Sequence, residues 1–119
     1  FVDVAGLSVS ITPSFTSSKI LVMANIALNG PNSGRADCRV LRDSTPIGVG
    51  DSSGVLGIAA IEDDMVFSTS LNYLDSPSTT SAVTYKAQFS SGGTAYINRR
   101  ATSASPITFS SITVMEVAG

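Results

Sequence analysis

Apolar and polar residues alternate through much of the second half of the chain. Met65, Phe67, Leu71 and Tyr73 fall on one face of an extended segment, and serine and asparagine dominate the other face. The segment from Val83 to Phe89 repeats this pattern, with threonine, lysine and glutamine between its apolar residues. A period of two residues is typical of a β-strand that buries one face.

Turn-forming residues divide the chain into short segments of this kind. They cluster at four places: Asn29–Gly34, Gly48–Gly54, Asp75–Ser78 and Ser90–Gly93. A short helix competes with a strand only between Val55 and Asp64. We predict strands at Leu7–Ile11, Ile20–Leu28, Ala36–Arg42, Ile47–Val49, Val55–Ile61, Met65–Leu74, Ala82–Phe89, Ala95–Arg99 and Ile107–Val117, the last with a break near Ser110. Eight or nine short strands separated by turns indicate an all-β, antiparallel β-sandwich or jelly roll.

Two of these segments are apolar on both faces. They are Ile20–Leu28, interrupted only by Asn25, and Ile112–Val117, whose residues are β-branched or apolar except for Glu116. The outer face of an antiparallel sandwich normally meets water and is polar, so such strands need a second cover.

In a small domain without helices, the simplest second cover is another copy of the chain. We therefore predict an oligomer whose interface contains Leu21, Met23 and Ala27, or the residues of opposite parity, together with Val114. The alternative cover is a segment that precedes Phe1, because the chain opens within a strand-like sequence and is expected to be the C-terminal part of a longer polypeptide.

Composition narrows the classes of function. The 119 residues suit a single domain, and 43% of them are apolar while only 13% are charged. The formal net charge is −2 and the basic residues are scattered, which argues against nucleic-acid binding. No apolar run approaches the ~20 residues of a membrane span, so we expect no membrane insertion. Cys38 is the single cysteine, so it forms no intrachain disulfide, and we interpret it as a small buried hydrophobe.

The residues needed for common enzyme chemistry are missing. The chain has no histidine, which removes Ser-His-Asp and Cys-His catalysis and every histidine-bearing zinc site. The one dense acidic group, Glu62, Asp63 and Asp64, is either a solvated turn or a weak Ca²⁺ site, and it lacks the spacing of a Ca²⁺-binding loop. We predict no catalytic residue, no metal and no cofactor. An enzyme would need two converging carboxylates with perturbed pKa values.

Three residues near the predicted eighth strand are candidates for contact with a receptor. Tyr96 is expected to face outward, whereas Tyr73 and Tyr85 lie on apolar strand faces and are expected in the core. Arg99 and Arg100 follow an apolar segment and form either surface ion pairs or a site for an acidic group, because guanidinium pairs well with carboxylate and phosphate.

Several sequence blocks occur in an order that resembles a known family. They are Gly6–Pro13, Thr16–Val22, Leu71–Pro77, Thr84–Lys86 and Ser111–Glu116. Together they resemble a recurrent C-terminal module of bacteriophage virion proteins, common in phages of marine bacteria and cyanobacteria, which occurs on tail fibres and on capsid appendages or decorations. The resemblance covers nearly the whole chain, 1–119, as one domain.

This resemblance implies a jelly roll like those of tumour necrosis factor and C1q, assembled as a homotrimer at the virion surface. It implies a non-enzymatic role, either attachment to a host-cell glycan or protein, as at a tail-fibre tip, or contact with other virion proteins, as in capsid decoration. No family motif fixes a receptor site. The alternative is a C1q-like or carbohydrate-binding recognition module of a cellular protein, against which the absence of tryptophan weighs.

Overall fold

A computed structural model describes residues 1–30, 36–50, 56–58 and 65–119 of the chain. In that part of the chain every regular element is a β-strand, which confirms the predicted all-β class. The strands are β1 (Val2–Ile11), β2 (Lys19–Asn29), β3 (Ala36–Arg42), β4 (Thr45–Ile47), β5 (Leu56–Ile58), β6 (Phe67–Asp75), β7 (Val83–Ser91), β8 (Tyr96–Ile97) and β9 (Ser111–Val117).

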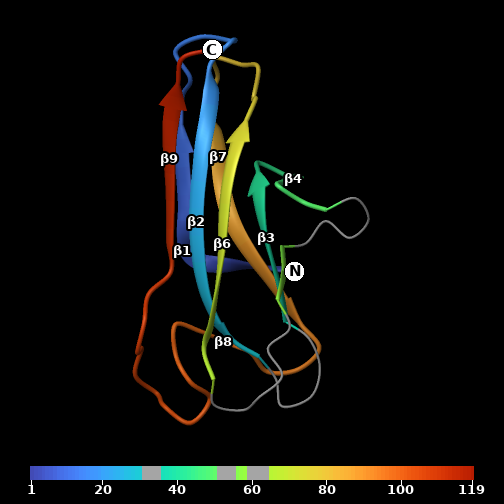
Figure 1. The fold of residues 1–119 in the computed structure, drawn as a ribbon, viewed down its shortest axis with the longest axis vertical. Coiled ribbons are helices and arrows are strands. Elements are labelled where there is room, and N and C mark those ends of the chain that lie inside the picture. The colour runs from blue at the N-terminus through green and yellow to red at the C-terminus, as the bar shows by residue number, and fades with distance from the viewer. Residues whose placement is uncertain (31–35, 51–55, 59–64) are drawn as a thin grey trace.

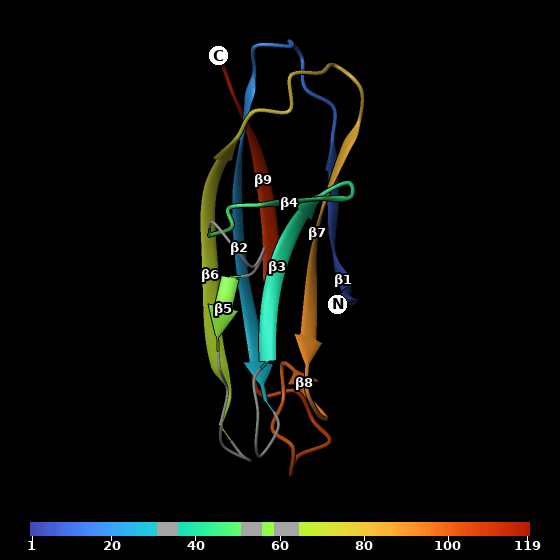
Figure 2. The same ribbon diagram turned by 90° about the vertical axis from the view of Figure 1, so that its right-hand side faces the viewer.

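The strands form two antiparallel sheets that lie face to face. One sheet has the order β1-β7-β3-β4, and β5 also pairs with β3. In the other sheet β2 is central, with β6 along one side and β9 and β8 along the other. Figure 1 shows β9, β2 and β6 side by side, and Figure 2 shows the two sheets as separate layers. The predicted antiparallel sandwich is therefore present.

Alternation along β2 places the core between the sheets. Ile20, Val22, Ala24, Ile26 and Leu28 are all at most 5% exposed and face the other sheet. They pack against buried residues of the facing strands, including Val40, Tyr85 and Ala87. Because side chains alternate along a strand, the residues between them on β2 face away from the core.

Several strand boundaries differ from those predicted: β4 covers Thr45–Ile47 and not Ile47–Val49, β8 covers only Tyr96–Ile97, and the starts of β1 and β9 also differ. β1 begins five residues earlier than expected, and its register with β7 shifts between Asp3 and Ser8, where Gly6 has a φ of 79°. The predicted strand from Ile107 starts only at Ser111. There, Asn98 has a φ of 62° and its carbonyl accepts hydrogen bonds from the amides of Ile107 and Thr108, which closes a loop instead of extending a strand.

Of three residues expected in the core, the structure shows one to be exposed and two to be buried. Tyr73 lies on β6 and is 39% exposed, because among the described residues no strand pairs with the outer edge of β6. Tyr85 is fully buried. Cys38 is also fully buried, and burial, with a smaller contribution from the charge of Asp37, raises the pKa of its thiol to about 11. Cys38 is therefore an inert core residue.

Candidate contact surface

The outward face of the sheet β6-β2-β9 carries a row of large apolar side chains. Leu21 of β2 lies directly opposite Leu74 of β6 on one side and opposite Met115 of β9 on the other. Leu74 is 52% and Met115 51% exposed, while Leu21 between them is half-buried. Side chains directly opposite each other on adjacent strands are in contact range, so these three form one continuous apolar patch.

The two neighbouring rows of this outward face are uncharged. The next row consists of Asn72, Met23 and Thr113, and the row after it consists of Ser70, Asn25 and Ser111. Lys19 lies at one end of the face, opposite Val117, and its Nζ donates to the hydroxyl of Ser76 at 2.8 Å. Within these paired rows of the described strands, Lys19 is the single charged residue. We call this surface, from Leu21 to Asn25 on β2 and the paired residues of β6 and β9, the uncharged face.

The outward face of the other sheet has the opposite character. Lys86 forms an ion pair with Asp3 at 3.1 Å, and the Gln88 amide donates to the same carboxylate at 2.6 Å. Arg39 donates to Gln88 at 2.8 Å and its guanidinium lies 4.0 Å from the centre of the Phe1 ring. Two sheets of one sandwich thus present a charged, hydrogen-bonded surface on one side and an uncharged surface on the other.

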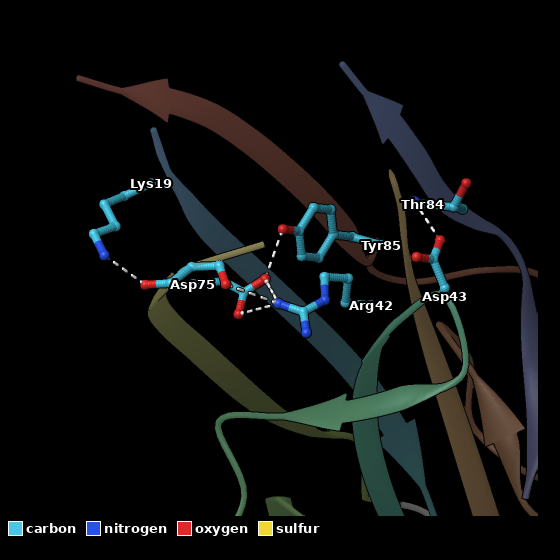
Figure 3. A network of polar contacts seen from close by, with 7 residues as sticks. Lys19, Arg42, Asp43, Asp75, Thr84 and Tyr85 are labelled. Carbon is cyan, nitrogen blue, oxygen red and sulfur yellow. Dashed lines mark hydrogen bonds and ion pairs between the residues drawn. The ribbon is translucent and has the colours of Figure 1, made fainter. Parts of the chain in front are cut away.

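A buried polar network joins the two sheets near the Lys19 end of the uncharged face (Figure 3). Arg42 of β3 donates to both carboxylate oxygens of Asp75 on β6, at 2.9 and 2.8 Å. The Tyr85 hydroxyl of β7 donates to the same carboxylate at 2.8 Å. Burial, followed by the hydrogen bond to Asp75, raises the pKa of Tyr85, so its hydroxyl stays protonated and acts as a donor. With its donors paired in this way, the network is suited to holding the sheets together.

Sequence reasoning missed this network, although the sequence contains a signal for it. Asp75 has the same parity as Leu71 and Tyr73, so an ideal strand places its carboxylate on the inward face. An acidic residue at an inward position needs a buried cationic or hydrogen-bonding partner. What the sequence alone does not identify is which of the seven basic residues supplies it.

The predicted interface residues occupy three different environments. Leu21 and Met23 lie on the uncharged face and are half-buried. Ala27 has the same outward parity but is fully buried, and its amide donates to the Ser110 hydroxyl at 2.9 Å. Val114 is opposite Val22 and packs against the core, so its assignment to the outward face is corrected. Leu74 and Met115 take its place as exposed apolar members.

The structure brings together two of the three predicted receptor-contact residues. The Arg99 guanidinium lies 4.0 Å from the centre of the Tyr96 ring, and its Nη1 donates to the Ser103 carbonyl at 2.6 Å. Arg99 thereby covers one face of the ring, which leaves less of it for stacking against a sugar. Arg100 is exposed at the start of the following turn.

Glu62, Asp63 and Asp64 lie outside the described part of the chain. Across residues 1–30, 36–50 and 65–119 no three metal-ligating side chains come together. No helix of membrane-spanning length and hydropathy occurs in the part of the chain that the structure describes.

Comparisons with known proteins identify no relative from which a function could be inferred, so the proposal below rests on the uncharged face. No protein-family model and no curated protein matches this sequence.

Proposed function

We propose that this chain is a non-enzymatic contact module of a bacteriophage virion that assembles as a homotrimer through the uncharged face. The observation that carries the proposal is the row Leu74, Leu21 and Met115, exposed side by side on a sheet surface with no charge among them. Exposed apolar patches bordered by polar residues are typical of protein interfaces.

We also propose that the sandwich is a jelly roll, and the order of its strands supports this. The antiparallel pairs β1 with β7, β2 with β6, and β3 with β4 or β5 are nested within one another along the chain. A chain folded back on itself in this way and rolled into two sheets has jelly-roll connectivity. The sequence blocks that resemble the phage module lie mostly on β1, β2, β6, β7 and β9.

The contrast between the two outward faces supports a defined orientation in the assembly. Burying the uncharged face costs little desolvation, because serine, threonine and asparagine can pair across an interface and the apolar row leaves water. Burying the face with Asp3, Lys86 and Arg39 would remove charged side chains from water at a high desolvation cost. This face is therefore suited to water or to a polar partner. In this arrangement the virion surface displays the charged sheet.

Trimer formation is tested by the mass of the protein in solution. Sedimentation equilibrium of the full chain is expected to give three times the chain mass of 12.2 kDa. A monomer at all concentrations up to the millimolar range would overturn the assembly proposal. Virion attachment is tested separately by adding the labelled trimer to susceptible host cells: saturable binding supports a tail-fibre tip, and binding to virions that lack the protein supports decoration.

A further inference from the structure

The core of the sandwich is incompletely covered along the side where β1 and β9 meet. Strands β1 and β9 lie against each other there, although they belong to different sheets (Figure 1). Four apolar residues line this side, Val9 and Ile11 on β1 and Ile112 and Val114 on β9, and all four are only partly buried against the core. We call this line of residues the seam.

The backbone beside the seam is an open strand edge. β9 pairs with β2 through seven consecutive residues without a register shift, and among the described residues no strand pairs with its other side. Alternate residues of β9 therefore direct their amide hydrogens and carbonyl oxygens away from β2. This row of alternating partial charges is complementary to another extended backbone and to little else.

The other long sheet edges have features that discourage pairing, whereas the only such feature of β9 in the described structure is the charge of Glu116. The β1 edge is interrupted by its register shift near Gly6, and β4 contains Pro46. Edge strand β6 ends in the inward-facing charge of Asp75, and β5 of the other sheet lies near it without pairing with it. β9 contains neither proline nor lysine, and its one charge, Glu116, is held by the Ser14 amide and hydroxyl at 2.6 and 2.9 Å.

From these observations we infer that β9 is an acceptor for an added β-strand, supplied in extended form by a separate polypeptide of the particle. The added strand pairs antiparallel with β9 and covers the seam with apolar side chains at every second position. Main-chain hydrogen bonds would supply affinity, and contact with the apolar side chains of Val9, Ile11, Ile112 and Val114 would supply selectivity, as in other cases of strand addition.

The choice of a separate polypeptide rests on the proposed trimer. Two identical edges pair with each other only across a two-fold axis, and a three-fold assembly provides none. In a trimer closed through the uncharged face, each β9 edge therefore stays available to another chain. A dimer joined edge to edge through β9 is the arrangement that this inference excludes.

Amide hydrogen exchange of the full chain tests the inference. The probe is a synthetic nine-residue peptide of alternating valine and threonine with a lysine at each end. At saturating peptide, alternate amides of Ser111–Val117 are expected to exchange at least tenfold more slowly. A matched peptide with proline in place of threonine lacks the necessary amides and is expected to leave these rates unchanged. The amides of β6 serve as the internal control.

The outcomes separate the two proposals. Unchanged β9 exchange with the valine–threonine peptide, or equal protection of β6, overturns strand addition. A two-fold dimer whose β9 amides are already protected without peptide overturns it as well. A monomer that still gains peptide-dependent protection of β9 overturns the trimer and leaves the strand acceptor standing.

Discussion

Arg42 and Asp75 connect the two sheets of the sandwich, with Arg42 Nη1 2.8 Å from Asp75 Oδ2 and the Asp75 side chain only 7% exposed. The pair is completed by the Tyr85 hydroxyl, so one buried carboxylate gathers donors from β3 and β7. Breaking a buried ion pair by removing one partner costs far more than losing a surface pair, because the remaining charge stays uncompensated.

Replacing Asp75 by alanine is expected to lower the free energy of unfolding by about 3 kcal/mol, the lower end of the range for buried pairs, since Arg42 keeps some access to water. Urea denaturation at pH 7 measures this loss. Asp3→Ala removes the exposed pair with Lys86 and is the matched control, for which a much smaller change is expected. Equal losses in the two variants would contradict the assignment of Asp75 as the connection between the sheets.

Tyr85→Phe deletes only the hydroxyl that donates to Asp75 and is expected to cost about 1.5 kcal/mol, because the acceptor is charged and buried. Tyr96→Phe is the control, since the ring that stacks against Arg99 is kept. Thermal and urea unfolding should show a clear loss of stability for Tyr85→Phe, whereas Tyr96→Phe should stay close to the unaltered protein.

Met23→Asp is expected to abolish assembly, because it would bury an unpaired charge in the middle of the uncharged face. Ser8→Asp, on the outward side of β1 in the charged sheet, adds the same charge and should leave the trimer intact. Sedimentation of the two variants provides the comparison. A Met23→Asp protein that still sediments as a trimer would refute the placement of the interface.

Association also predicts that thermal stability depends on protein concentration. A folded chain that is stabilised by its partners unfolds at a higher temperature as the concentration rises. Melting curves over a hundredfold range of concentration should show this shift for the unaltered protein and for Ser8→Asp. The shift should disappear in Met23→Asp, and a concentration-independent melt of the unaltered protein would count against self-association.

Glu116 makes the stability of the β9 end dependent on pH. The Ser18 hydroxyl beside the carboxylate and the donating Ser14 amide and hydroxyl hold the pKa of Glu116 below its usual value. Because the folded pKa is lowered, its contribution to stability is present above the unfolded value, about 4.3, and is lost as the pH falls through the folded value. Glu116→Gln should therefore be less stable than the unaltered protein at pH 7, and the difference should shrink below about pH 4. A difference that stays constant from pH 7 to pH 3 would contradict this role.

The sequence predicted most of the strands because apolar and polar residues alternate along them, which indicates a strand with one buried face. It left the orientation of β2 open, because a segment with apolar residues at both parities does not reveal which side is the core. Asn25 was the usable clue, since it shares the outward parity of Leu21 and Met23. Val114 was misplaced for the same reason: β9 is apolar on both sides, and only its register with Val22 shows that Val114 points inward.

Contacts between residues far apart along the chain were beyond sequence reasoning. Arg42 and Asp75 are joined by the stacking of two sheets, and the Tyr85 hydroxyl reaches Asp75 from the same facing sheet. Alternation describes each strand by itself, whereas these contacts depend on how strands from different parts of the chain come together.

The separation of the charged and uncharged surfaces also bears on how such a protein could change over time. The side chains of Asp3, Arg39, Lys86 and Gln88 interact with one another and with Phe1, on the opposite side of the core from Leu21 and Leu74. Substitutions among them can alter what the particle presents to its surroundings without touching the surface that joins the copies. A sandwich arranged in this way can acquire new recognition properties while its assembly stays under separate selection.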